Sequence, residues 1–237
     1  MGHVTETPSA PRTARARARA ELTAEIVETA RAHLAEEGAA GLSLRAVSRD
    51  LGMVSSAIYR YFPSRDDLLT RLIIDAYNSL ADTVEAEESE VRHRSDLRGR
   101  WLAVAHGSRD WALARPQEWS LIYGSPVPGY RAPEDTIGPA TRVPALLLAF
   151  LVELEAGGGV AEPHPVPRTV RAAIAPVRGF LPDTVPDDLV VRGLMAWTEL
   201  IGAITLEING QFVNVVDDMD EYFDHAMRRT AEVLGLG

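Results

Sequence analysis

The segment Leu44–Leu69 has the sequence LRAVSRDLGMVSSAIYRYFPSRDDLL. Leu44, Val47 and Leu51 recur at helical spacing, so a short helix can bury this face and turn its arginines outward. Gly52 then allows a tight turn that a residue with a β-carbon would resist, after which the chain re-enters helix. Two short helices joined by a glycine-containing turn form a helix-turn-helix, whose second helix has the width of a DNA major groove.

The second short helix, expected over Val54–Tyr61, carries the chemistry that points to nucleic acid. Its hydroxyls and guanidinium hydrogen-bond phosphates and base edges, and a helix used only for packing would not need them. The residues that we expect to contact DNA here are Ser55, Ser56, Tyr59, Arg60 and Tyr61. The sequence therefore predicts that this helix faces DNA.

A third helix follows at once. Pro63 ends the second helix, and Ser64 is placed as the N-cap of the next one with Asp67 at the capping-box position. Arg65 then lies at a helix N-terminus, where a further positive charge is unfavourable unless an anion is near. We expect a DNA phosphate to be that anion.

The order L-x-x-[VA]-x-x-x-L-G, then I-Y-x-Y-F, then acidic residues and paired leucines, resembles the TetR family of bacterial transcriptional regulators over roughly Leu22 to Leu80. The resemblance implies that Tyr59 and Arg65 hold phosphates. It also implies that the preceding helix, near Ser43 and Arg45, lies against the DNA backbone, while the helix from Val54 enters the major groove.

The sequence departs from the family pattern at two places, of which the first matters for the recognition helix. A Ser or Thr usually caps the recognition helix, whereas Val54 stands here, and Pro-Ser-Arg replaces the commoner Lys-x-Lys a few residues later. The cap can stay at Val54 or move to Ser55. The register in which the helix reads bases therefore stays open at this point.

The length of 237 residues and the composition favour a helical protein in two parts. Hydrophobic residues make up 46% and aromatic residues only 6%, a balance that suits helices. We expect an all-α protein, with a basic, disordered arm over 1–20, a three-helix helix-turn-helix domain over 21–67, and a helical effector-binding and dimerisation domain over 68–237. In the arm, Arg17 and Arg19 would contact phosphates or enter a minor groove; the alternative is a tail without a role.

Charge is distributed unevenly along the chain. The formal net charge is -10, but residues 1–71 hold 10 arginines and 9 acidic residues, whereas residues 72–237 hold 14 arginines and 25 acidic residues. DNA would repel the acidic part, which favours docking through the first part. No apolar run approaches the ~20 residues of a membrane span, and the N-terminus lacks the pattern of a signal peptide. We therefore expect a soluble, cytoplasmic protein with no membrane partner.

Signatures of catalysis are missing from the sequence. There is no cysteine, no glycine-rich phosphate loop and no G-x-S-x-G or H-E-x-x-H motif. No two of the six histidines stand at i, i+3 or i, i+4, which argues against a histidine-pair metal site on one helix. We expect no catalytic residue, metal or cofactor; an enzyme whose site is assembled from distant carboxylates is the alternative.

The second part has two features of an effector domain. Apolar residues from Leu68 to Val84 sustain one helical stripe, so this helix can belong to both parts and transmit a change between them. Aromatic residues then cluster beside a histidine on the next helices, as in a largely apolar ligand pocket. The expected ligand-binding residues are Trp101, His106, Trp111, Trp119 and Tyr123. Plain core packing is the alternative for each of them.

The last two helices, 187–208 and 218–234, point to a dimer. The first has almost no polar face, so a monomer would expose a large apolar patch. The expected interface residues are Leu194, Trp197, Ile201, Ile204, Met219, Phe223 and Met227. Two such helices meeting their copies would form a four-helix interface with two-fold symmetry. A monomer that buries both helices is the alternative.

The C-terminal part resembles the WHG type within the TetR family, named for a W-x-x-x-H-G signature. That signature falls at Trp197, Ile201 and Gly202, with Ile201 in place of the histidine. Together these features predict a homodimeric repressor that binds a near-palindromic operator and responds to an unknown small-molecule effector. The alternative is a DNA-binding regulator without an effector.

Overall fold

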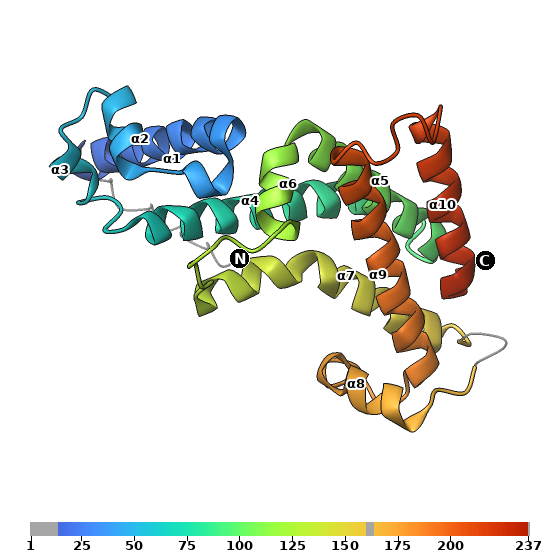
Figure 1. The fold of residues 1–237 in the computed structure, drawn as a ribbon. Coiled ribbons are helices and arrows are strands. Elements are labelled where there is room, and N and C mark those ends of the chain that lie inside the picture. Colours follow the sequence, from blue (N-terminus) through green and yellow to red (C-terminus); the bar gives the residue numbers. More distant parts are fainter. Residues whose placement is uncertain (1–13, 160–163, 237) are drawn as a thin grey trace, which may run out of the picture. The chain divides into compact units, whose positions relative to one another are not determined.

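The computed structural model describes residues 14–159 and 164–236, and all regular structure within those residues is helical (Figure 1). The all-α prediction is therefore confirmed. The chain divides into two compact units, Met1–Leu72 (unit 1) and Ile73–Gly237 (unit 2). The division falls inside the helix α4 (Arg65–Ser89), so this helix contributes residues to both units.

Unit 1 consists of α1 (Ala14–Gly41), α2 (Leu44–Asp50), α3 (Ser55–Ile58) and the first turns of α4. Its apolar residues recur at the spacing of one helix face, so each helix buries one side against the others. The buried residues that form this small core include Ile26, Val27, Leu34, Val47, Ile58, Leu68 and Leu69.

The first helix corrects the expectation of a disordered arm. Residues 14–20 are helical and exposed, and do not belong to a disordered arm, because this stretch alternates alanine with arginine, which are strong helix formers. The expectation for residues 1–13 lies outside the described residues. His33 of the same helix is buried, with Nε2 2.7 Å from Oδ2 of Asp50. This contact joins α1 to the end of α2.

Unit 2 contains the remainder of α4 and the helices that follow. These are α5 (Leu97–Ala114), α6 (Pro116–Tyr123), α7 (Ile137–Ala156), α8 (Arg168–Arg178), α9 (Asp187–Ile208) and α10 (Met219–Leu234), with a short 3₁₀ turn at Glu134–Thr136. Local chemistry sets several ends: Pro116 begins α6, and the Asp218 carboxylate accepts a hydrogen bond from the backbone N–H of Glu221 at the start of α10.

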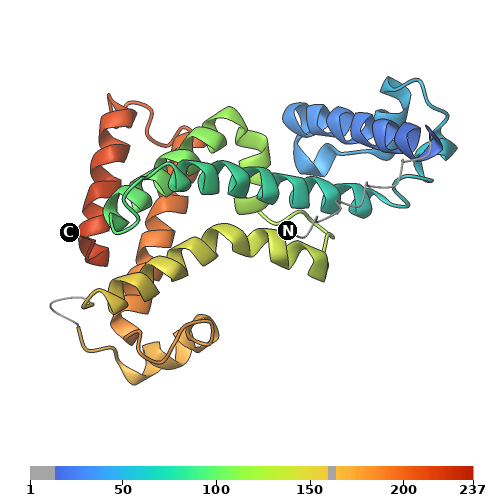
Figure 2. The same ribbon diagram turned by 180° about the vertical axis from the view of Figure 1, so that it is seen from behind.

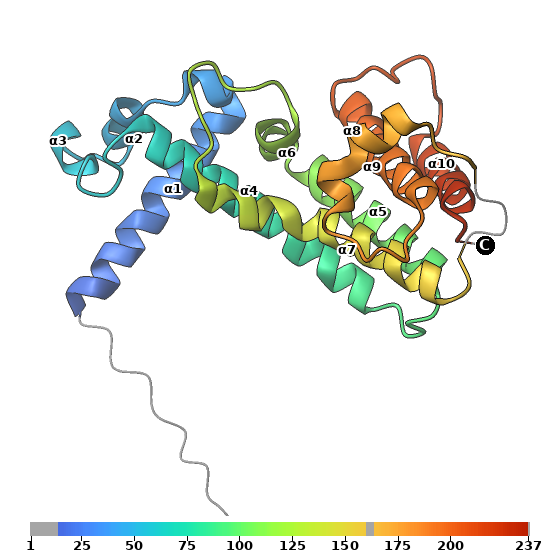
Figure 3. The same ribbon diagram turned by 90° about the horizontal axis from the view of Figure 1, so that it is seen from below.

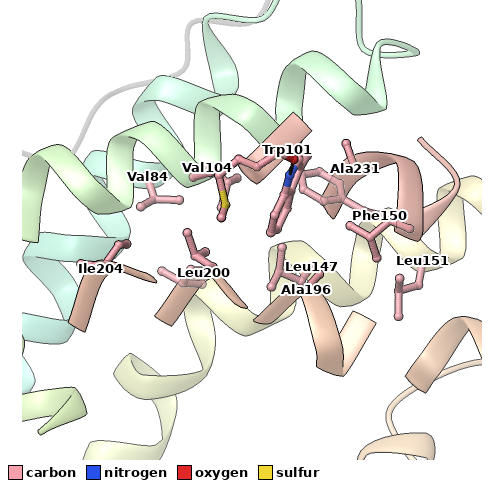
Figure 4. Packing of buried hydrophobic residues seen from close by; sticks show 14 of the residues in the cluster. Val84, Trp101, Val104, Leu147, Phe150, Leu151, Ala196, Leu200, Ile204 and Ala231 are labelled. Carbon is pink, nitrogen blue, oxygen red and sulfur yellow. Dashed lines mark hydrogen bonds between the residues drawn. The ribbon is translucent and has the colours of Figure 1, made fainter. Parts of the chain in front are cut away.

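The core of unit 2 is one continuous cluster. Side chains of α4, α5, α7, α9 and α10 converge in it, and Figure 4 shows Trp101 and Val104 near Leu147 and Leu200. The helix α9 packs on α5, α7 and α10 and is therefore central to the unit (Figure 2). In the view of Figure 3, α8 and α10 lie near α9, and among the helices α8 packs mainly against α9.

Ion pairs that cross between helices complete the interior of unit 2. Arg100 is buried and donates from Nε to Glu88 at 2.5 Å and from Nη1 to Glu153 at 2.5 Å. Burial by itself would raise the pKa of Glu88, but hydrogen bonds from Arg94 and Arg100 outweigh it and hold this pKa below its ordinary value. Arg109 joins Glu207 of α9 and Asp220 of α10 in the same way.

Two segments of unit 2, Glu134–Ala156 and Asp187–Ile208, are by length and composition apolar enough to cross a bilayer. The expectation that no run approaches this length was therefore too strict. Both segments supply core residues, such as Leu147 and Leu200. A core helix of a soluble protein can be equally long and equally apolar. Neither segment indicates a membrane protein.

Candidate functional site

The helix-turn-helix of unit 1 places a polar surface on a buried support. Gly52 has a φ of +63°, which confirms the predicted glycine turn between α2 and α3. Ile58 is fully buried and anchors α3, while Ser55, Ser56 and Arg60 are exposed. Tyr59 is also exposed. The side chains expected to contact DNA thus share the outer surface of one short element.

The helix α3 is shorter than expected and its start is now fixed. It covers Ser55–Ile58, and a turn follows in which the Tyr61 N–H donates to the Ile58 carbonyl at 2.9 Å. Pro63 disfavours helical backbone at the residue before it, so the helix does not extend. Val54 occupies the N-cap position without a side-chain cap and is 72% exposed. The cap has therefore not moved to Ser55, which begins the helix.

Arg19 of α1 braces this turn. Its Nη2 donates to the Arg60 carbonyl at 2.9 Å, and its guanidinium carbon lies 5.0 Å from the centre of the Tyr61 ring. The quadrupole of an aromatic ring attracts a cation that lies over the ring face. Arg17 is exposed on the same helix. The structure therefore brings Arg19 to Arg60 and Tyr61, from which it is distant in the sequence.

Arg65 has partners that the sequence did not reveal. Its Nε donates to the Leu42 carbonyl at 3.0 Å and its Nη2 to the Ala39 carbonyl at 2.6 Å. These backbone oxygens follow a kink at Gly38, which has a φ of +69°, and a carbonyl oxygen accepts a hydrogen bond from a cation. The protein itself therefore supplies the negative partner for which a phosphate was expected, and the phosphate contact of Arg65 stays a prediction.

The start of α4 and the start of α2 complete the candidate interface. The Ser64 hydroxyl donates to the Asp67 carboxylate at 2.6 Å and accepts from the Asp67 N–H at 3.1 Å, which confirms the predicted cap. Ser43 precedes α2 with extended backbone, and its side chain makes no cap hydrogen bond. Arg45 is exposed beside it.

Three of the expected ligand-binding residues of unit 2 do not meet in one cavity. Trp101 is fully buried and its indole N–H donates to the Met227 carbonyl at 2.9 Å; that of Trp111 donates to the Ser79 hydroxyl at 3.0 Å. Both residues are core residues, as the alternative stated. His106 lies on another side, with Nε2 3.2 Å from Oδ1 of Asp224.

Trp119 and Tyr123 do line a cavity together. It measures about 460 Å³ and is bounded on the α9 side by Thr205 and Asn209. The Trp119 indole N–H donates to the Thr205 hydroxyl at 3.1 Å. The Tyr123 ring centre lies 4.6 Å from that of Trp119 and 5.9 Å from that of Trp197, and burial raises the pKa of the Tyr123 hydroxyl above its ordinary value.

A second cavity, which the sequence reasoning missed, measures about 170 Å³ and lies between α7, α8 and α9. Its lining consists of Pro144, Leu147, Leu148, Leu151, Val177, Val190, Gly193, Leu194 and Trp197. The sequence signal for this region was the presence of Pro144 and Gly193 inside otherwise apolar helices. Both residue types weaken a helix interior, so their presence there marks a position with a special packing or functional role.

Comparisons with known proteins identify the family. Residues 26–72 match the family model described as bacterial regulatory proteins, tetR family, and residues 101–230 match the model described as tetracyclin repressor-like, C-terminal domain. The chain belongs to the TetR family. This TetR-family regulator is therefore a helix-turn-helix transcriptional regulator, from a family of DNA-binding proteins and not of enzymes.

Individual relatives of this TetR-family regulator agree. It is 42% identical over 228 residues to the HTH-type transcriptional regulator Rv1816 of Mycobacterium tuberculosis, covering 92% of this chain and 94% of the relative. The regulatory protein SCO4313 has a similar crystal structure, with a TM-score of 0.74, 35% identity, and coverage of 93% and 100%. RolR, solved in complex with resorcinol, shares the fold at a TM-score of 0.51 and 17% identity, with coverage of 94% and 95%.

The expected dimer residues of this TetR-family regulator divide into two groups. Ile204, Phe223 and Met227 are fully buried in the core of their own chain, so they do not form an outer surface. Leu194 is exposed, and Trp197, Ile201 and Met219 are half-buried. The sequence could not separate the groups, because α9 is apolar on nearly all sides.

Further exposed apolar side chains lie on the same two helices, and we refer to them together as the outward apolar strip. On α9 it includes Met195, 56% exposed, and Leu206, 45% exposed; on α10 it includes Tyr222 and Val233. Gly202 of the expected W-x-x-x-H-G signature lies between the two α9 residues in sequence, and a β-carbon there would meet no atom within 4 Å. Among the described residues, no cluster of histidines and carboxylates could hold a metal ion.

Proposed function

We propose that this regulator is a cytoplasmic, ligand-responsive repressor that binds a near-palindromic operator as a homodimer. The observation that carries the proposal is the composition of unit 2, which combines an outward apolar strip on α9 and α10 with two partly open cavities. A unit that served only as a scaffold for α3 would need neither feature.

The apolar strip supports the homodimer. Pairing Met195, Leu206, Tyr222 and Val233 with the same residues of a second chain removes them from water on both sides of a two-fold axis. The family is one of regulators that act as dimers. Dimeric readers place their recognition helices about 34 Å apart, one turn of DNA or a multiple, so the operator would be a near-palindrome.

The DNA contacts follow from the exposed residues of unit 1. We propose that Ser55, Ser56 and Arg60 contact base edges, because they are exposed on α3 and on the turn that follows it. The positively charged or hydroxyl groups around them would hold phosphates and set the register without specifying sequence. These positioning residues are Arg17, Arg19, Ser43, Arg45, Tyr59, Tyr61 and Arg65.

Effector control is the second part of the proposal. The two cavities of unit 2, the aromatic residues beside them and the example of RolR, whose fold accommodates resorcinol, support a small-molecule site in unit 2. A molecule that binds one conformation better than another shifts the population of the dimer. The helix α4 contributes to both units and would carry that shift to α3.

Selection of genomic fragments by the purified protein tests the proposal. We expect the bound fragments to share an inverted repeat and the protein to elute as a dimer. A metabolite panel added to the operator complex should then contain a compound that releases the DNA. Recovery of single half-sites by a monomer would contradict the dimer, and a complex that no compound releases would favour the effector-independent alternative.

A further inference from the structure

The cavity between α7, α8 and α9 has a lining of one chemical kind. Leu147, Leu148 and Leu151 come from α7, Val177 from α8, and Leu194 and Trp197 from α9. None of the lining residues carries a charge, and the indole N–H of Trp197 is the one polar side-chain group among them. An ion that entered would lose its hydration without gaining a partner, which is strongly unfavourable.

The volume restricts the occupant further. The cavity measures about 170 Å³ and is partly open, because Leu194 in its lining is 39% exposed. A closed protein cavity of roughly 150 Å³ with a similar apolar lining binds benzene. Sites for drug-sized ligands start at roughly 300 Å³. The space therefore suits a molecule with a single ring or a short branched chain.

One wall of the cavity is a close contact between a glycine of α9 and a leucine of α7. Voids larger than a water molecule are few in protein interiors, because an unfilled space loses contacts. Gly193 also lines this cavity, and a β-carbon there would lie 2.8 Å from Cδ1 of Leu151. Glycine is unfavourable inside a helix, and at this position it lets the end of the Leu151 side chain approach the backbone of α9.

We infer that the effector of this regulator is a small, uncharged, hydrophobic molecule that binds in the cavity between α7, α8 and α9. The inference rests on the proposed function, because it names the ligand of that regulation. The helix α9 supplies Leu194 and Trp197 to the cavity and Met195 to the outward apolar strip. Trp197 also contacts Tyr123, so an occupant touches the aromatic cluster at the end of α6. A bound molecule can therefore act on the dimer face through α9.

Thermal unfolding of the full chain with two probes tests the ligand class. Toluene has the size and polarity that the lining selects, and benzoate is a charged aromatic of similar width. We expect toluene to raise the unfolding midpoint by about 3–5 °C at ten times its dissociation constant, and benzoate to leave it unchanged. An equal rise with both probes, or no rise with toluene, would overturn the inference.

A filled cavity provides the site control. Val177→Phe places a ring into the space, whereas Val170→Phe makes the same change in α8 at a half-buried residue that does not line the cavity. The toluene shift should disappear in the first variant and persist in the second. If Val177→Phe does not fold, Leu148→Phe fills the cavity from α7 and should remove the shift equally. If toluene still raises the unfolding midpoint of a folded variant with a filled cavity, the assignment of the binding site to this cavity is wrong.

Operator binding separates this inference from the proposed function. If the protein selects no operator, the proposed function fails, while a toluene shift that Val177→Phe removes still supports the site. If a metabolite releases the operator complex equally well from the parent chain and from Val177→Phe, the proposed function stands and the inference fails. Release that requires an open cavity, by an uncharged compound, is the expected result.

Discussion

The outer surface of α3 and the interior of unit 2 use the same kinds of polar residue in opposite ways. On α3 and the turn after it, Ser55, Ser56 and Arg60 are exposed, while Ile58 is buried beneath them. In unit 2, Arg100 and Arg109 are buried and directed at carboxylates of neighbouring helices. A polar side chain on a supported surface is available to a partner molecule, whereas one that closes a buried ion pair is committed to the fold. The predictions below test this division.

The largest effect is expected at Arg109. Arg109→Ala leaves the half-buried Glu207 without the cation that its carboxylate faces, so the free energy of unfolding should fall by about 3 kcal/mol. Chemical denaturation of the purified variant measures this. The matched control is Arg229→Ala, which removes an exposed pair with Glu232 and should change stability little. Equal losses of unfolding free energy in the two variants would contradict the distinction between buried arginines that hold the fold and exposed ones that do not.

A somewhat smaller loss, with a defined pH dependence, is expected at Glu88. Because its pKa is lowered in the folded protein, ionised Glu88 contributes stability above its unfolded pKa of about 4.3, and this contribution is lost as the pH falls through the lower folded value. Glu88→Gln should therefore cost roughly 2 kcal/mol at pH 7 and progressively less below pH 4. A gap between the two proteins that stayed constant down to pH 3 would contradict the assignment.

The next effect concerns binding and not stability. Arg60→Ala should weaken operator binding by about 1–3 kcal/mol and relax the preference at one base-pair position, while the unfolding midpoint stays unchanged. Binding to operators substituted at each position measures this. Arg45→Ala is the control, since loss of a phosphate contact should weaken all sequences alike and reduce the salt slope by about 1. If Arg60→Ala weakens binding to all operator sequences equally, Arg60 positions the protein on the DNA backbone and does not read a base.

The smallest effect decides the role of Arg65. If its bonds to the Leu42 and Ala39 carbonyls are its main contribution, Arg65→Ala should lower the stability of unit 1 by about 1 kcal/mol and leave the salt slope of DNA binding unchanged. If it holds a phosphate, the salt slope should fall by about 1 with little change in stability. Thermal unfolding and salt-dependent binding of the same variant distinguish these outcomes.

Much of unit 1 could be predicted because its signals are local. The glycine turn, the Ser64–Asp67 cap and the buried periodicity all depend on residues within a few positions of one another. What failed there depends on distant residues. The partners of His33 and Arg65 come from other helices, and the helical start of α1 was hidden because alternating arginine and alanine also fit a mobile arm.

The sequence by itself determined that this chain is helical, that it carries a helix-turn-helix, and that this element belongs to a TetR-family regulator. Only the tertiary structure decided which apolar residues of α9 and α10 face the core and which face outward, and where the cavities lie. The physical reason is that a helix with almost no polar face gives no periodic signal for its orientation. Its neighbours fix that orientation when the helices pack together.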